Sequence, residues 1–208
     1  MNRIRHATGI KAVLFDFGGV LAELRAETHL LPLLKHRMNR EEMWTRWSTS
    51  PAMRAHETGR ISAEQFSERI VREFELDVSP PVFLTGFREW IVGPFAETHD
   101  LIRDVAARHT TALLTNVSAL HWPVIESLGV LSHMHHVFAS WQIGLIKPDL
   151  TYYQYVLDKM SLEPGEAVFF DDSPLNVAAA REIGLHGYRV ENAMQARQQL
   201  TILGLLPD

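Results

Sequence analysis

The most informative part of the sequence lies near its start and reads Val13-Leu14-Phe15-Asp16-Phe17-Gly18-Gly19-Val20-Leu21. The run from Ala12 to Phe15 is entirely apolar, which is typical of a strand buried on both faces of a parallel sheet. Asp16 follows at once, and the Gly-Gly pair after it indicates a tight turn or a close backbone approach. Ligands bind at the carboxyl ends of central strands in open α/β sheets. We therefore interpret Asp16 as a nucleophile, the alternative being an Asp that only caps the turn.

Strands and helices alternate along the second half of the chain. We expect strands at Thr110 to Thr115, Val137 to Ser140, Ala167 to Phe170 and Gly187 to Val190, and helices at Thr98 to His109, Trp122 to Leu128, Leu150 to Met160, from Ser173-Pro174 onward, and at Ala193 to Leu203. Such alternation indicates βαβ units, in which helices cover both faces of a parallel sheet. The sequence therefore predicts an α/β fold with a doubly wound parallel sheet.

The segment between the first strand and this second half has only helical signals. No convincing strand is found from Glu23 to Trp90, and Val82 to Ile91 is interpreted as a short helix. Asn39 and Ser62 are each followed three residues later by Glu or Gln, the pattern of a capping box at a helix start. We expect a core of residues 8–22 and 94–208, with an all-helical insert at residues 23–93.

Composition limits the possible partners. The 208 residues carry a net charge of −5, have no basic run and include no cysteine. Nucleic acids and anionic membranes bind clustered Lys and Arg, so we expect neither as a partner. Residues 1–11 lack the apolar run of a signal peptide, and no segment reaches the roughly 18 apolar residues of a membrane span. We expect a cytoplasmic protein, and the sequence leaves its oligomeric state open.

Polar residues follow three of the expected strands, namely Asp16, Thr115-Asn116 and Asp171-Asp172, and Lys147 lies in a loop before a helix. The carboxyl ends of parallel strands share one edge of the sheet, so these groups should converge. Two unit charges about 4 Å apart interact by roughly 4 kcal/mol at an effective dielectric constant of about 20. Three converging carboxylates would therefore repel one another unless a cation lies among them. Because the available ligands are oxygen atoms and the chain has no cysteine, the pattern favours Mg²⁺. The pattern indicates a metal-bound phosphate site with a carboxylate nucleophile.

These four motifs, in this order, resemble those of the haloacid dehalogenase-like hydrolases. The helical insert resembles the small cap of that superfamily's subfamily IA, and the resemblance implies a Rossmann-like core. The segments at residues 15–20, 56–62, 114–116 and 168–172 are most similar to a subgroup that contains α-D-glucose-1-phosphate phosphatase.

The resemblance also implies roles for individual residues. Asp16 would attack phosphorus and form an aspartyl-phosphate that water then hydrolyses. Thr115 and Lys147 would bind the phosphoryl group, with Asn116 beside the substrate. The Mg²⁺ ligands would be Asp16, the carbonyl of Gly18, and Asp172, with Asp171 as a further ligand or a support. The expected substrate is a small phosphorylated metabolite such as a sugar phosphate.

The sequence departs from the family pattern at Gly18. Most phosphatases of the superfamily have there a second Asp that acts as general acid and base, help that is typically worth about 10²–10⁴-fold in rate. A leaving group that needs little protonation, such as a sugar's anomeric oxygen, would reduce the cost of losing it. His56 is one candidate replacement, the alternative being a surface or packing histidine in the cap.

Two other functions are consistent with Gly18. A 2-haloacid dehalogenase also lacks the second Asp, but such enzymes use no metal and have small polar residues in place of the Asp171-Asp172 pair. A non-catalytic relative would bind a phosphorylated ligand or a protein partner. The segment containing Arg54, His56, Glu57 and Arg60 is either an exposed turn or a cap loop that reaches over the site and selects the substrate.

Overall fold

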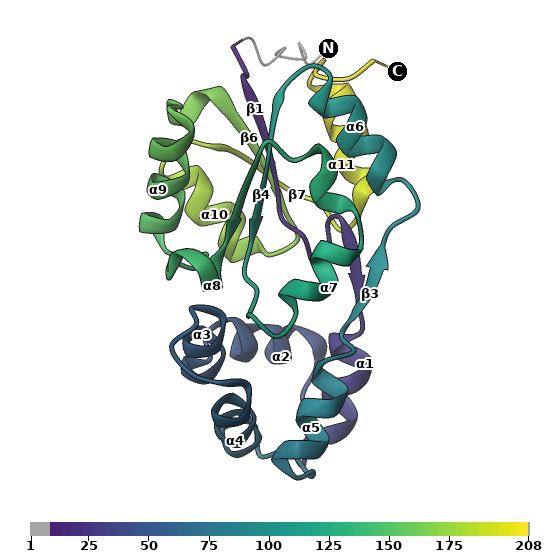
Figure 1. Ribbon diagram of the computed structural model, residues 1–208, viewed down its shortest axis with the longest axis vertical. Helices are drawn as coiled ribbons and strands as arrows, with labels where there is room; N and C mark the ends of the chain where they lie inside the picture. Colours follow the sequence, from purple (N-terminus) through teal and green to yellow (C-terminus); the bar gives the residue numbers. More distant parts are fainter. Residues whose placement is uncertain (1–8, 208) are drawn as a thin grey trace.

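A five-stranded parallel sheet forms the centre of the structure, a computed structural model that describes residues 9–207 (Figure 1). Its strands, in the order β5-β4-β1-β6-β7, are β5 (His136–Ala139), β4 (Thr110–Thr115), β1 (Ala12–Phe15), β6 (Ala167–Asp171) and β7 (His186–Arg189). β1 pairs in parallel with both β4 and β6. The predicted α/β fold with a parallel sheet is therefore confirmed.

The apolar run of β1 is explained by helices on both faces of the sheet. Val13 and Phe15 pack on one side, and Ala12 and Leu14 on the other, as the two-residue period of a strand requires. The first side is covered by α6 (Thr98–Ala106), α7 (Trp122–Ser127) and α11 (Ala193–Ile202), the second by α8 (Ser140–Ile143), α9 (Leu150–Met160) and α10 (Pro174–Glu182) (Figure 1). None of the helices within residues 9–207 combines the length and apolar character needed to cross a membrane.

A group of helices, here called the cap, lies beyond the carboxyl edge of the sheet, below it in Figure 1. Its elements are α1 (Ala26–Leu30), a short 3-10 helix (Leu31–Leu33), α2 (Arg40–Ser48), α3 (Pro51–Glu57), α4 (Ala63–Glu73) and α5 (Pro80–Phe87). The cap has its own apolar cluster, in which Trp47 packs against aromatic rings of several of these elements. Both predicted capping boxes form, at Asn39 before α2 and at Ser62 before α4.

Two predictions about the insert are wrong. A short strand, β2 (Ala22–Leu24), occurs where none is expected, and it pairs antiparallel with β3 (Ile91–Pro94). The helix predicted up to Ile91 ends at Phe87, because the chain must then extend to form β3. The partner of each strand is distant in sequence, so no local pattern indicates the pairing. The boundaries of the insert at residues 23 and 93 stay a prediction. Residues 1–8 and 208 lie outside the described residues, so the expected ends of the core and the expected absence of a signal peptide cannot be compared with the structure there.

The helix α3 is also absent from the sequence predictions, which interpret residues 54–60 as a turn or a loop. Ser50 caps this helix by accepting a hydrogen bond from the backbone N–H of Met53 at 3.1 Å, and Pro51 occupies its first turn. Both residues are typical of helix starts. His56 and Glu57 therefore lie in the last turn of a helix.

The cap cluster gives a first test of the fold. Trp47 is 7% exposed, so Trp47→Ala should lower the free energy of unfolding by about 3–5 kcal/mol. Trp44, which is only half-buried in the same helix, is the matched control, and Trp44→Ala should cost clearly less. Urea denaturation followed by circular dichroism measures both, and equal losses would contradict the assigned packing.

Candidate active site

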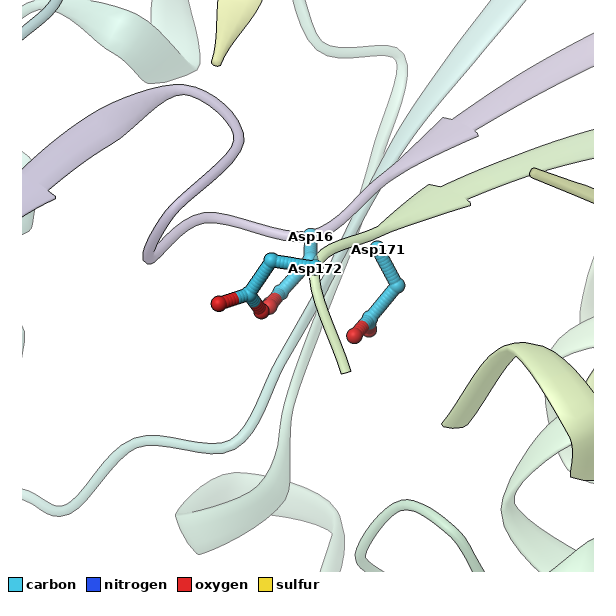
Figure 2. A group of neighbouring side chains, drawn as sticks. All are labelled: Asp16, Asp171 and Asp172. Atoms are coloured by element: carbon cyan, nitrogen blue, oxygen red, sulfur yellow. The ribbon is translucent and has the colours of Figure 1, made fainter. Parts of the chain in front are cut away.

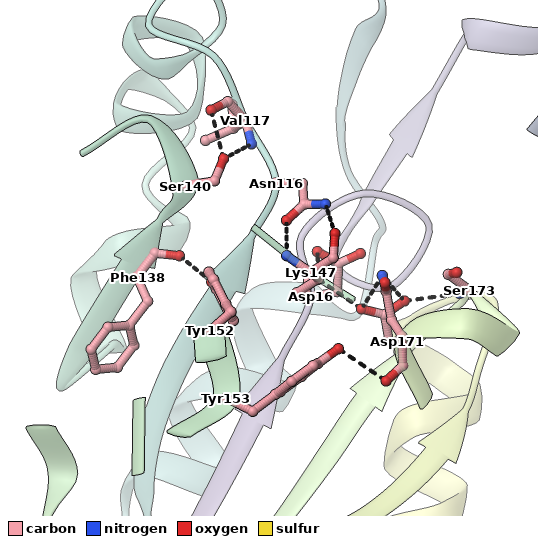
Figure 3. A network of polar contacts seen from close by, with 11 residues as sticks. Asp16, Asn116, Val117, Phe138, Ser140, Lys147, Tyr152, Tyr153, Asp171 and Ser173 are labelled. Carbon is pink, nitrogen blue, oxygen red and sulfur yellow. Dashed lines mark hydrogen bonds and ion pairs between the residues drawn. The ribbon is translucent and has the colours of Figure 1, made fainter. Parts of the chain in front are cut away.

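The ammonium group of Lys147 lies buried between two carboxylates at the carboxyl edge of the sheet (Figure 3). Its Nζ is 2.8 Å from Oδ1 of Asp16 and 2.7 Å from Oδ2 of Asp171. Asp16 directly follows β1, Asp171 ends β6, and Lys147 lies in the loop between α8 and α9. The structure thus brings together residues that the sequence singles out from three separate segments.

Asp171 is fully buried, and protein groups already occupy both of its carboxylate oxygens. Oδ1 accepts hydrogen bonds from the backbone N–H of Ser173 at 2.9 Å and from Nδ2 of Asn176 at 3.0 Å. Oδ2 accepts from Lys147 and, at 3.1 Å, from the same Asn176 amide. These contacts favour a supporting role for Asp171, in which it holds Lys147 in place.

Asn116 holds the backbone of the same lysine. Its Nδ2 donates to the carbonyl of Lys147 at 2.9 Å, and its Oδ1 accepts from the N–H of Lys147 at 3.0 Å. The amide thereby fixes the loop that carries the ammonium group, while the predicted contact of Asn116 with substrate stays a prediction. Thr115 ends β4 beside it and is 2% exposed, and its predicted phosphate contact is likewise untested.

Asp16, Asp171 and Asp172 can each offer an oxygen within 4.8 Å of the others (Figure 2). The turn after β1 comes close to this group. Gly19 has a φ of +75°, and a Cβ on it would lie 2.5 Å from Oδ2 of Asp172. The glycine is therefore required both by its backbone conformation and by a close approach. Gly18 lies in the same turn, and its carbonyl as a metal ligand stays a prediction.

The site holds more negative charge than one lysine can balance. Burial raises the pKa of Asp16 to about 8, and the carboxylates of Asp171 and Asp172 add to the rise although Lys147 opposes it. Burial, followed by the charge of Asp171, raises the pKa of Asp172 to about 7. Burial alone would lower the pKa of Lys147, but Asp16 and Asp171 outweigh it and raise the pKa. A hard divalent cation with oxygen ligands fits this excess, and Asp16 and Asp172 are the residues best placed to hold it.

A fourth carboxyl group, in the cap, is acted on by the charges of Lys147 and Asp16. Glu57 is half-buried at the end of α3. Burial raises the pKa of its carboxyl group to about 8; the positive charge of Lys147 opposes this rise, and the negative charge of Asp16 adds to it. Sequence reasoning treats Glu57 only as part of a turn or a cap loop. The Ser50-Pro51 pair is the signal that could have placed it on a helix.

His56, the adjacent residue, packs inside the cap and does not face the site. It is 4% exposed, and its ring stacks on Phe66 with centroids 4.4 Å apart. Burial lowers its pKa to about 4. Of the two interpretations of His56, the structure therefore favours a packing histidine. Arg54 forms an ion pair with Asp149 of the core, while Arg60 is exposed.

The family is established by a comparison with known proteins. The family model of the haloacid dehalogenase-like hydrolases matches residues 10–184. The chain belongs to this family. The predicted resemblance is thereby confirmed, and in this haloacid dehalogenase-like hydrolase the buried Lys147 lies with its two aspartates at the carboxyl edge of the sheet.

Two curated relatives align with nearly the whole chain. The D-ribitol-5-phosphate phosphatase of Bacteroides thetaiotaomicron is 23% identical over 206 residues, which cover 93% of this chain and 98% of the relative. A sesquiterpene phosphatase of Aspergillus oryzae is 24% identical over 201 residues, covering 93% and 96%.

Solved structures share the fold of this hydrolase. A family enzyme from Bacteroides thetaiotaomicron, crystallised with magnesium and inorganic phosphate, superposes with a TM-score of 0.67 at 22% identity, covering 87% of this chain and 94% of that one. An L-2-haloacid dehalogenase from Xanthobacter autotrophicus superposes with a TM-score of 0.62 at 18% identity, covering 87% and 77%. A family enzyme with bound magnesium and phosphate and a dehalogenase thus share this fold, so the site residues must decide the reaction.

The raised pKa values predict how stability depends on pH and metal. A carboxyl group whose pKa rises on folding makes the folded state lose stability as pH rises from the unfolded to the folded pKa, here from about pH 4 to about pH 8 for Asp16. The metal-free protein should therefore melt at lower temperature as pH rises through this range. Mg²⁺ should raise the melting temperature, and more so at high pH, because it binds the ionised carboxylates.

Thermal melting with Mg²⁺ and with EDTA measures both effects, and Asp172→Asn provides the control. This variant should lose most of the response to Mg²⁺ and part of the pH dependence. A melting temperature that rises with pH in EDTA would contradict the assigned electrostatics.

Proposed function

We propose that this hydrolase is an Mg²⁺-dependent phosphatase that hydrolyses a small phosphomonoester through an aspartyl-phosphate on Asp16. The observation that carries the proposal is the buried Asp16–Lys147–Asp171 ion triad, with the carboxylate of Asp172 beside it. The two curated relatives are named as phosphatases, and one solved neighbour was crystallised with magnesium and phosphate, which supports the same assignment.

In this proposal each site residue has a defined role. Asp16 attacks phosphorus, and Lys147 stabilises negative charge on the phosphoryl oxygens. Thr115 donates a hydrogen bond to the phosphoryl group, and Asn116 fixes the lysine loop beside the substrate. Asp172 and Asp16, with the carbonyl of Gly18, would hold Mg²⁺. Asp171 holds Lys147 in place. Bound Mg²⁺ would neutralise charge on the phosphoryl group as it is transferred.

The remaining expectations complete the proposal. We take residues 23–93 as the cap that selects the substrate, a small phosphorylated metabolite as that substrate, and the cytoplasm as the location. A 2-haloacid dehalogenase is disfavoured because Asp171 and Asp172 are both present and converge with Asp16.

The proposal predicts metal-dependent turnover that requires Asp16. The purified protein should hydrolyse p-nitrophenyl phosphate, and one or more of D-ribitol 5-phosphate, α-D-glucose 1-phosphate and related esters, with Mg²⁺ but not with EDTA. Asp16→Asn should lose more than about 10³-fold in kcat, because no other group can form the covalent intermediate. Asp158→Asn, which changes an exposed carboxylate in α9, should leave kcat unchanged.

Three results would contradict the proposal. Absence of turnover on every ester, together with measurable binding of phosphate, would favour a non-catalytic ligand-binding protein. Chloride release from 2-chloropropionate without metal would favour a dehalogenase. Full activity of Asp172→Ala in the presence of Mg²⁺ would remove the assigned metal site.

A further inference from the structure

The turn after β1 has no proton donor where related phosphatases have one. Gly18 occupies that position, and the space beside it is filled by Leu24 of β2. A Cβ built on Gly18 would lie 2.6 Å from Cδ1 of this leucine. A side chain that protonates the leaving oxygen would therefore have to come from another element.

The cap helix α3 ends at Glu57, and this end of the helix is fixed on the core. The hydroxyl of Ser140 donates to the carbonyl of Glu57 at 2.7 Å. The same hydroxyl accepts from the backbone N–H of Val117 at 3.0 Å, two residues beyond Thr115. Glu57 is thereby tied through one side chain to the loop that follows β4.

Two further contacts hold the same helix end. Arg54, one turn earlier in α3, forms an ion pair with Asp149, two residues beyond Lys147. Gly59 lies so close to the core that a Cβ on it would be 3.2 Å from the carbonyl oxygen of Trp141. These contacts hold the backbone of Glu57 against the core, beside α8 and the loop that follows β4.

The surroundings of Glu57 suit a proton donor. Its carboxyl group is half-buried, and the charged groups that act on it are Lys147 and Asp16, the proposed phosphate-binding lysine and nucleophile. Burial raises its pKa to about 8, which favours the neutral carboxyl group. A carboxylic acid kept neutral in this way can protonate a leaving group and afterwards accept a proton from water.

Three other polar residues of this region are less suited to move a proton. The ring nitrogens of His56 have no hydrogen-bond partner within the described residues, but the ring stacks on Phe66 inside the cap. Asp171 is occupied by Lys147, Asn176 and the backbone of Ser173. Asp172 belongs to the carboxylate group that would hold the metal.

We propose that Glu57 is the general acid and base of the reaction and replaces the side chain that is absent at Gly18. The inference rests on the proposed phosphatase function. As Asp16 attacks phosphorus, the bond to the leaving oxygen breaks, and that oxygen takes the bonding pair and the proton of Glu57. Water then attacks the aspartyl-phosphate, Glu57 takes the proton of water, and the phosphorus–oxygen bond to Asp16 breaks. Alcohol and phosphate leave, and both carboxyl groups return to their starting states.

The test compares two leaving groups of similar shape in Glu57→Gln. Phenoxide needs protonation far more than p-nitrophenoxide does. Turnover of phenyl phosphate should therefore fall by about 10²-fold or more. With p-nitrophenyl phosphate the first step should persist, and one equivalent of p-nitrophenol should appear in a burst before slow turnover, because the base for the second step is missing. The wild type should show no such burst.

Two control variants separate catalysis from folding. Glu68→Gln alters an exposed carboxylate in α4 and should behave as the wild type. Glu57→Asp keeps the carboxyl group but moves it back by one methylene, and it should recover part of the phenyl phosphate activity. Melting temperatures are measured for every variant.

The proposal is overturned if Glu57→Gln keeps the wild-type ratio of the two rates and shows no burst, while the wild type is active and Asp16→Asn is not. It is also overturned if Glu57→Asp recovers no phenyl phosphate activity while melting like the wild type. Absence of turnover by the wild type, or full activity of Asp16→Asn, would instead overturn the phosphatase function itself, and the role of Glu57 with it.

Discussion

The structure depends on the burial of one ammonium group, that of Lys147, between the carboxylates of Asp16 and Asp171. A buried charge is costly unless it is paired and hydrogen-bonded, and removing one partner of such a pair typically costs about 3–5 kcal/mol. The surrounding polar groups meet this demand, since Asn116 fixes the lysine backbone while Asn176 and Ser173 satisfy Asp171. The strand order β4-β1-β6 is what brings these groups to one edge of the sheet.

In our proposal the core lacks a general acid and base, and the cap provides one. With Leu24 beside Gly18, the turn after β1 can contribute backbone but no acidic side chain. The hydrogen bond from Ser140 to the carbonyl of Glu57 fixes the end of α3 on the core, and in our proposal it thereby positions the proton donor. Substrate selection and proton transfer would then depend on a single docking geometry between cap and core.

Much of this structure could be predicted from local sequence. Runs such as Ala12 to Phe15 indicate core strands because both faces are buried, and Asn39 and Ser62 indicate helix starts because capping depends on nearby residues. The pairing of β2 with β3 and the clamp of Asn116 on Lys147 could not be predicted, since each joins segments distant in sequence. The proximity of Glu57 to the core cannot be predicted for the same reason. The residues near Glu57 that matter for its role, Ser140, Lys147 and Asp16, belong to the core and are distant in sequence. The segment at residues 54–60 itself resembles an ordinary turn.

The central claim is that Asp16, held by Lys147, carries the phosphoryl group during turnover. Rapid quenching of the enzyme with substrate and Mg²⁺, followed by borohydride reduction and peptide mass spectrometry, tests it directly. We predict homoserine at position 16, formed from the acyl phosphate and absent when EDTA replaces Mg²⁺. Rapid turnover with unmodified Asp16, or with the phosphoryl group on another residue, would contradict the account.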